Sequence, residues 1–268
     1  MKQAIKVTKL RFSYGQNEVI HGINFQVAKG KIATLIGNTG GGKTSLVKLL
    51  IGLEEGQGQI ELLGENLEAL STPLEQIIRV VFASSYQTFR EKTVKNELTI
   101  PLKNMNLKKE EINIYIDDIV TLFKIEDLLP KNPKQLTKEE ASIIAIATAL
   151  VTKPQILILD DAFIHMGAIA KKRIFRILKQ LNRKNHLTIF NVTHDVNDIL
   201  YGDYVILLYQ GKVVLKGDVA DVIKSEKILK KYHYELPFMA ELSDKLRYYN
   251  VIEETILDMN RMVSTIWK

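Results

Sequence analysis

Residues 37–45 (GNTGGGKTS) have the residue types and the spacing of a loop that binds phosphate. Gly37, Gly42, Lys43 and Thr44 occupy the fixed positions of the pattern G-x-x-x-x-G-K-[ST]. Glycine tolerates positive φ and close approach, so the backbone N–H groups of this loop can converge on one anion. Lys43 is then placed to reach the β- and γ-phosphates of a nucleotide, and the Thr44 hydroxyl to bind magnesium. The residues expected to contact the nucleotide are Gly37, Asn38, Thr39, Gly40, Gly41, Gly42, Lys43, Thr44 and Ser45.

The segments on either side of the loop support the same interpretation. The apolar run 32–36 (IATLI) predicts a buried strand, and residues 44–50 (TSLVKLL) predict a helix. The amino terminus of such a helix adds a dipole that favours phosphate. The alternative is a glycine turn without a ligand, and the strand and helix beside it argue against that alternative.

A pair of acids forms a second chemical element. Residues 155–161 (QILILDD) read as a buried strand that ends in Asp160 and Asp161. The carboxyl end of a parallel strand lies at the edge of the sheet where ligands bind. One carboxylate at that edge can hold magnesium through water, and we expect Asp160 to do so. The alternative is a pair of helix-capping acids.

A histidine forms the third element. Thr193-His194-Asp195 follows the apolar run 187–192 directly, so His194 leaves a strand at the same edge as the glycine loop. From there its ring can point at the γ-phosphate, and we expect it to take part in the chemistry. A lone histidine is more often structural, and that alternative stays open.

Composition limits the class of protein. The chain has 268 residues, of which 46% are hydrophobic and 25% charged, and no cysteine, so disulfides and zinc–thiolate sites are excluded. Its apolar runs are shorter than the roughly 18 residues of a membrane span, and residues 1–10 lack an apolar signal core, so we expect a cytoplasmic protein. The net charge of +6 is spread along the chain, without the concentrated basic stripe and aromatics that would indicate nucleic acid.

The order of the predicted elements indicates an α/β fold. Strands alternate with helices, which implies a mostly parallel sheet with both faces covered. Residues 90–150 are charged and helical in period and predict an inserted helical subdomain, and the chain after Gly217 is expected to be helical to its end, including 236–267 with Val251, Ile252 and Ile256. Strands are expected at 5–12, 19–27, 31–36, 58–63, 79–82, 155–159, 187–192 and 204–209.

With these elements in this order, the chain resembles the ATP-binding subunit of ABC transporters over residues 4 to about 220. Tyr14 matches the residue that stacks on adenine, 37–45 the Walker A motif, 156–160 the Walker B strand and His194 the switch histidine. The resemblance implies a P-loop core at 1–220 with antiparallel amino-terminal strands and a helical extension at 221–268. It also implies ATP and Mg²⁺ as ligands, with Thr44 and Asp160 at the metal and Lys43, Asp161 and His194 as catalytic residues.

Within that family the chain resembles the energy-coupling factor ATPases most. Residues 81–94 (VFASSYQTFREKTV) follow their pattern, and residues 236–247 (LPFMAELSDKLR) resemble the carboxyl-terminal extension that those ATPases carry. The resemblance implies a peripheral protein on the cytoplasmic face of the cell membrane that drives micronutrient uptake. Its partners would be a second ATPase subunit, a transmembrane T component and a substrate-binding S component, and its extension would help to form the ATPase dimer.

The signature loop departs from the family pattern. The motif LSGGQ corresponds to residues 136–140 (LTKEE), where both glycines are missing and Glu139 and Glu140 are present. Thr137 and Glu140 have the spacing of a capping box, so the helix can start while the phosphate site is lost. We interpret the two acids as residues that stabilise a helix start.

Three further motifs are altered. Asp161 stands where the family has the catalytic glutamate, Ala83 stands at the Q-loop glutamine, and Gly167 at the D-loop aspartate. Gln87 and His165 lie nearby in sequence and are possible substitutes. We therefore expect ATP binding with weakened hydrolysis, and a heterodimer in preference to a homodimer. The alternative is a non-hydrolysing ATP-binding scaffold or regulator of the same kind of complex.

Overall fold

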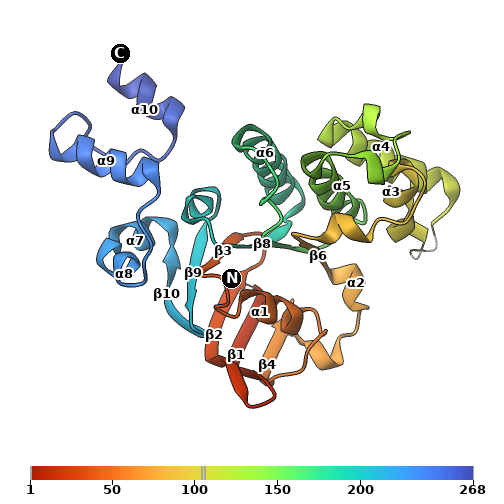
Figure 1. Cartoon of the computed structure of the whole chain (residues 1–268), viewed down its shortest axis with the longest axis horizontal. Helices are drawn as coiled ribbons and strands as arrows, with labels where there is room; N and C mark the ends of the chain where they lie inside the picture. The colour runs from red at the N-terminus through yellow and green to blue at the C-terminus, as the bar shows by residue number, and fades with distance from the viewer. Residues whose placement is uncertain (1, 104, 106, 268) are drawn as a thin grey trace.

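The computed structural model describes residues 2–103, 105 and 107–267, and its centre is a mostly parallel β-sheet (Figure 1). Among the described residues this sheet has six strands in the order β10-β9-β3-β8-β7-β6. All neighbours pair in parallel except β10, which is antiparallel to β9. The strands are β3 (Ile32–Gly37), β6 (Ile78–Phe82), β7 (Ile156–Asp160), β8 (Thr188–Thr193), β9 (Tyr204–Tyr209) and β10 (Lys212–Asp218).

A second sheet is formed by the amino-terminal strands. Its described strands have the order β2-β1-β4-β5, and every pair is antiparallel, as expected. Its apolar face packs on α1 (Lys43–Leu50) and on one face of the parallel sheet. The strands are β1 (Gln3–Tyr14), β2 (Asn17–Ala28), β4 (Gln57–Leu62) and β5 (Glu65–Asn66).

The central strands are buried on both faces, which explains their uninterrupted apolar sequence. Every residue of β3, β7 and β8 is buried. Because side chains alternate along a strand, Ile156 and Ile158 join the cluster around α1, whereas Leu157 and Leu159 join the helical cluster on the opposite face. A run of this kind is typical of a parallel strand between two covering layers.

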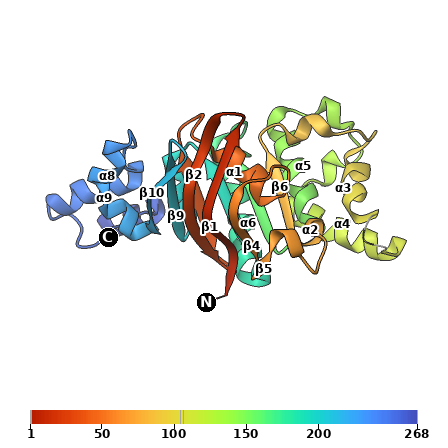
Figure 2. The same cartoon turned by 90° about the horizontal axis from the view of Figure 1, so that it is seen from below.

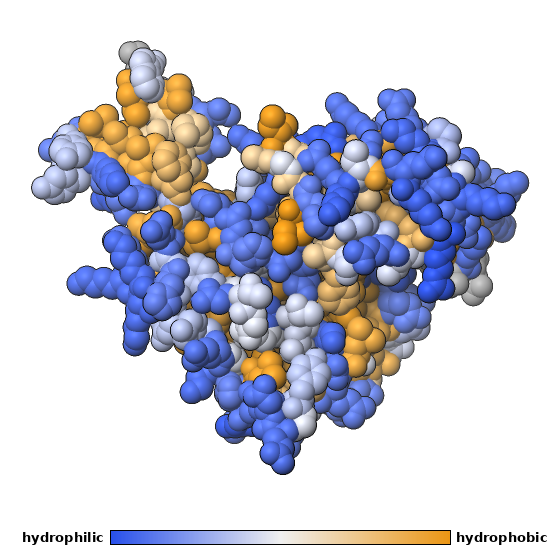
Figure 3. Space-filling model, viewed as in Figure 1, coloured by the Kyte–Doolittle hydropathy of each residue, from blue (hydrophilic) through white to orange (hydrophobic). Residues whose placement is uncertain are grey.

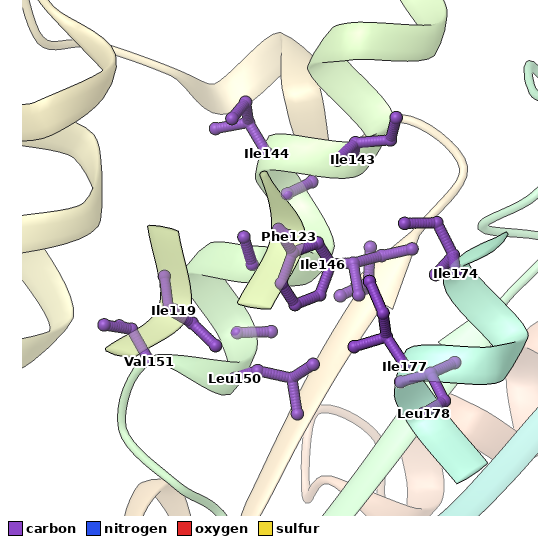
Figure 4. Packing of buried hydrophobic residues seen from close by; sticks show 14 of the residues in the cluster. Ile119, Phe123, Ile143, Ile144, Ile146, Leu150, Val151, Ile174, Ile177 and Leu178 are labelled. Atoms are coloured by element: carbon purple, nitrogen blue, oxygen red, sulfur yellow. The ribbon is translucent and has the colours of Figure 1, made fainter. Parts of the chain in front are cut away.

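Helices cover the other face of the parallel sheet and extend beyond it. The helices α5 and α6 lie next to the sheet, and α3 and α4 pack outside α5 (Figures 1 and 2). Their buried side chains form one cluster in which Phe123 lies among isoleucines and leucines (Figure 4). The α-helices of this part are α2 (Leu74–Ile77), α3 (Val94–Lys103), α4 (Lys109–Phe123), α5 (Lys138–Leu150) and α6 (Ala168–Asn185), and the 3₁₀ helices are η1 (Leu67–Ala69), η2 (Ser85–Thr88), η3 (Glu126–Leu128), η4 (Pro133–Gln135) and η5 (Val196–Tyr201).

The carboxyl-terminal segment is helical only in part. The connection between α9 and α10 is not helical, so the expectation of a helix through Val251, Ile252 and Ile256 is wrong. Ile252 and Ile256 are buried all the same, because this connection packs between the two helices, and Ser243 Oγ accepts a hydrogen bond from the Ile256 N–H at 2.8 Å. The helices are α7 (Val219–Lys224), α8 (Glu226–Lys231), α9 (Phe238–Tyr248) and α10 (Met259–Ile266).

The strand β10 is an element that the sequence analysis did not predict. It returns from β9 through a two-residue turn in which Gln210 and Gly211 both have positive φ (45° and 69°). Such a turn matches the twist of the strands that it joins. The alternation in β10 is weak, since Val213, Val214 and Leu215 are all half-buried and the register shifts between Val213 and Leu215.

No helix in the described part of the chain is both long enough and apolar enough to span a bilayer.

Phe123→Ala is expected to lower the free energy of unfolding by about 3–5 kcal/mol, because it leaves a cavity in the helical cluster. Phe123 is 0% exposed, whereas Ile114 on the same helix is 59% exposed. Ile114→Ala is the matched control and is expected to change stability by less than about 0.5 kcal/mol. Urea unfolding measures both, and equal losses would contradict this description of the cluster.

Candidate nucleotide site

The loop predicted to bind phosphate lies between the end of β3 and the start of α1, as expected. Gly42 is the residue before α1 and has a φ of 94°, a conformation that residues with a side chain rarely adopt. A Cβ atom on Gly37 would lie 2.6 Å from the Leu208 carbonyl oxygen. These glycines therefore let the loop curve tightly against its neighbours. Asn38, Thr39, Gly40 and Gly41 complete the curve, and Ser45 lies in the first turn of α1.

The Lys43 side chain lies inside the curve of this loop. Its ammonium donates hydrogen bonds to the carbonyl oxygens of Gly37 (2.7 Å) and Asn38 (3.1 Å). Burial lowers the pKa of Lys43, and the charges of Asp161 and Asp160 oppose that shift. An ammonium has three hydrogens, so the two bonds to the loop leave a third for an anion.

Asp160 and Thr44 come together at the carboxyl end of β7. Asp160 is 4% exposed, and its Oδ1 has no hydrogen-bond partner among the described residues. Burial raises the pKa of Asp160 to about 6, and a hydrogen bond with the Thr44 side chain acts in the opposite direction. A buried carboxylate with a free oxygen next to a hydroxyl fits Mg²⁺, which takes one or two protein oxygens together with water and phosphate.

Asp161 and His194 form a hydrogen-bonded pair. His194 Nδ1 lies 2.9 Å from Asp161 Oδ1, and the Asp161 N–H donates to the Val192 carbonyl at 2.9 Å. A carboxylate only accepts, so Nδ1 carries the hydrogen and Nε2 stays available for a ligand. Asp161 has a φ of 49°, a conformation that costs energy in a residue other than glycine and recurs at functional sites. The sequence placed both residues at one edge of the sheet but did not reveal the pair.

Tyr14 lies at the end of β1 and is 45% exposed. Its hydroxyl donates to Glu54 at 3.3 Å, and its ring packs edge-on against Phe12 with centroids 4.7 Å apart. These contacts fix the ring at the surface, as a residue that stacks on a base requires. Adenine stacking by Tyr14 stays a prediction.

The two acids at the start of α5 both have partners within the chain. The predicted capping box is confirmed: Glu140 Oε2 accepts from the Thr137 N–H at 2.8 Å, and Thr137 Oγ1 accepts from the Glu140 N–H at 3.2 Å. That backbone bond is the main reason why the pKa of Glu140 is lowered. Glu139 Oε2 accepts from the Gly167 N–H at 2.8 Å, which links the start of α5 to the start of α6. The sequence analysis missed this second contact, because the two residues are 28 positions apart.

Gln87 and His165, the possible substitutes for altered motif residues, take other places. Gln87 lines a pocket of about 270 Å³ with Phe89 and Leu136. The His165 ring packs edge-on against Tyr86 with centroids 5.5 Å apart.

Comparisons with known proteins agree with this geometry. A family model described as ABC transporter matches residues 20–164, which is more than half of the chain. The chain therefore belongs to the ABC transporter family and is an ABC-type ATPase.

The individual relatives indicate which group of ABC ATPases this chain is similar to. The chain is 28% identical to the energy-coupling factor transporter ATP-binding protein EcfA1 of Mycoplasmopsis pulmonis, over 90% of this chain and 93% of that protein. It is 29% identical to the protein of the same name from Mycoplasma pneumoniae, over 96% and 93%. The predicted similarity to energy-coupling factor ATPases is thus confirmed.

Solved structures give the same result for the fold. The structure of cbiO1 from Clostridium perfringens, described as part of the ABC transporter complex cbiONQ, has a TM-score of 0.78 and 25% identity. It covers 91% of this chain and 100% of its own. The dimeric cassette MJ0796 has a TM-score of 0.73 at 21% identity over 80% of this chain and 98% of its own, which shows the fold alone.

Asp160→Asn is expected to stabilise the nucleotide-free chain at pH 7.5. The folded pKa of Asp160 is about 6 against an ordinary value of 3.8, so the folded chain binds this proton more tightly than the unfolded chain. Stability therefore falls as pH rises between these two values, and the ionised carboxylate costs up to about 3 kcal/mol at neutral pH. Urea unfolding at pH 7.5 and pH 4 measures the gain, which should fall to about 0.5 kcal/mol at pH 4.

The control for this measurement is Asp117→Asn, at an exposed position on α4, which should change stability little at either pH. A gain for Asp160→Asn of equal size at both pH values would contradict the stated cause.

Proposed function

We propose that this chain is the ATP-binding subunit that energises a membrane importer of the energy-coupling factor type. The observation that carries the proposal is the convergence of Lys43, Thr44 and Asp160 at one edge of an ABC-type core. The relatives named above are ATP-binding proteins of such transporters and match along almost their whole length.

In this proposal the loop 37–45 wraps the phosphates of ATP. Lys43 contacts the β- and γ-phosphates, and the helix dipole of α1 and the backbone N–H groups bind the same anion. Thr44 and Asp160 would hold Mg²⁺, which would supply positive charge to the phosphate oxygens. Tyr14 stacks on the adenine. Asp161 orients the attacking water, and His194 directs Nε2 to the γ-phosphate.

Hydrolysis in this site is proposed to be slow. Asp161 is one methylene shorter than the glutamate of the family, and it is also engaged by His194 at 2.9 Å. A displacement of about 1 Å in a group that positions a reactant costs on the order of a hundredfold in rate. The substitution at Asp161 is therefore expected to weaken ATP hydrolysis more than ATP binding.

The start of α5 supports a heterodimer. In the family this loop contacts the γ-phosphate bound to the partner ATPase, and here it presents Glu139 and Glu140. Like charges at close range repel, and more strongly where water is excluded. Two copies of this chain would form two such sites, so we propose a different ATPase subunit as the partner, with ATP-driven closure of the pair as the working motion.

The extension 221–268 is proposed to contribute to that dimer. Hydrophobic surface lies over α9 and α10 (Figure 3). The large side chains exposed in this segment include Phe238 (61% exposed), Tyr248 (81%), Tyr249 (72%), Val263 (45%) and Trp267 (76%). Exposed apolar patches mark interaction sites. The T component and the S component would complete the importer and hold this chain at the cytoplasmic face of the membrane. We propose no nucleic-acid partner.

The isolated chain is expected to bind ATP–Mg²⁺ and to hydrolyse it about a hundredfold more slowly than an ordinary ABC ATPase. Lys43→Ala should weaken binding tenfold or more, because it removes a charged hydrogen bond to phosphate worth about 1.5–3 kcal/mol. Isothermal titration calorimetry measures the affinity and phosphate release the rate. Lys95→Ala, on the exposed side of α3, is the control. Absence of binding by the unaltered chain would refute the proposed function.

In the assembled transporter, Asp161→Glu is expected to raise ATP turnover, since it restores the missing methylene. Unchanged turnover would mean that Asp161 is not the limiting defect. The alternative function, a non-hydrolysing scaffold, is favoured by the short side chain of Asp161 and its hydrogen bond to His194. It predicts that transport is lost in Lys43→Ala and retained in Asp161→Ala, whereas an energising subunit loses transport in both variants.

A further inference from the structure

Lys171 is a half-buried cation next to the proposed catalytic pair. It lies in the first turn of α6, and its side chain is 16% exposed. Its ammonium forms ion pairs with Asp198, which is 1% exposed, and with Asp195, at 2.9 Å. Asp195 follows His194 directly in sequence, so Lys171 connects α6 to the turn that carries His194.

The rest of this turn is held by hydrogen bonds of its own. Asp195 Oδ1 accepts from the N–H and the side-chain amide of Asn197 at 2.9 and 3.0 Å, and the Asp195 N–H donates to Thr193 Oγ1 at 3.1 Å. The Asn191 amide lies 3.5 Å from Asp198. All these residues belong to β8, to η5 or to the turn between them. Lys171 ties this turn to α6, in addition to the bond between His194 and Asp161 and the bond from the Phe238 N–H to Asn197 Oδ1 at 3.4 Å.

The same cavity joins this network to the catalytic pair. A cavity of about 310 Å³ is lined by Lys171, Asp195 and Asp198 and also by Asp161 and His194. Burial lowers the pKa of Lys171, but the charge of Asp198 and the bonds to both carboxylates outweigh burial, so the net shift is upward. The ammonium is therefore charged at neutral pH.

Stability alone does not account for a charged residue here. Removing charges from water is costly, and a buried ion pair is often no more stable than apolar side chains of similar size. An ion pair instead fixes the relative orientation of its side chains, because the ammonium and the carboxylates must meet in one arrangement. A group that orients a reactant needs this kind of restraint, since a displacement of about 1 Å costs on the order of a hundredfold in rate.

We propose that Lys171 is a positioning residue for His194. By holding Asp195 and Asp198 against α6, it fixes the turn after β8 and keeps the His194 ring in its hydrogen bond to Asp161. This inference rests on the proposed ATPase site and adds to it a residue that touches neither nucleotide nor metal.

Lys171→Met and Lys171→Arg test the proposal in the transporter assembled with its partner ATPase. Lys171→Met should lower kcat for ATP tenfold or more and leave KM and the ATP affinity of the isolated chain within about twofold. Lys171→Arg keeps the charge and should restore most of kcat. Lys172→Met, at the exposed neighbouring position, is the matched control and should leave kcat unchanged. A Lys171→Met variant with unaltered kcat would overturn the proposal.

The ring of His194 gives a readout that does not depend on activity. The chain has five histidines, so imidazole ¹H–¹⁵N spectra of the isolated chain are simple, and His194→Gln assigns the signal. In the unaltered chain and in Lys171→Arg, the Nδ1 signal of His194 should be that of an N–H hydrogen-bonded to Asp161. In Lys171→Met, this signal should move to the position of an imidazole without that hydrogen bond. An unmoved signal would overturn the proposal even if the chain bound no ATP, whereas failure of ATP binding alone would refute only the proposed function.

A double variant separates positioning from folding. Lys171→Met leaves Asp198 buried and unpaired, which destabilises the chain. Lys171→Met with Asp198→Asn removes both charges at nearly constant volume and should recover the melting temperature. Under the proposal its kcat stays low and its His194 signal stays that of a free ring. Recovery of kcat together with the melting temperature would show a structural role only and would overturn the proposal.

Discussion

The register of the parallel strands determines where each charged group of the nucleotide site lies. Ile36 pairs with Thr193, and Asp160 pairs with Val192, so β3, β7 and β8 end at one level of the sheet. The glycine loop, the acid pair and His194 leave the strands from that level. A shift of one residue in any of these pairings would turn the side chains of that strand to the other face of the sheet and take its contribution out of the site. The packing of α1 on one side and α5 and α6 on the other maintains this register.

The charges concentrated at that edge of the sheet lower the stability of the ligand-free fold. Burial disfavours the charged forms of both Lys43 and Asp160, and the two groups partly offset each other. Asp161 adds a strained backbone conformation. Such features are typical of sites in which binding, and not folding, has determined the residue types. At these positions, the residue types that favour binding of nucleotide and metal therefore lower the stability of the ligand-free chain.

Much of the core and the main residues of the site could be predicted from the sequence, because they depend on local patterns. The glycine spacing around Lys43 and the apolar run before Asp160 are of this kind. The strand β10 was missed because Val213, Val214 and Leu215 do not alternate in burial. The connection between α9 and α10 was misread because Ile252 and Ile256 are buried outside a helix. The contacts of Asp161 with His194 and of Glu139 with Gly167 join residues far apart in the chain, and no local pattern contains that information.

The hydrogen bond between Glu139 and Gly167 ends where α6 begins, four residues before Lys171. The first turn of α6 therefore contacts both the start of α5 and the turn that carries His194. A displacement of the start of α5 would reach the turn after β8 through this one turn of helix. In the proposed ATPase dimer, a partner that docks on the start of α5 would thus act on His194 without touching the nucleotide held by this chain.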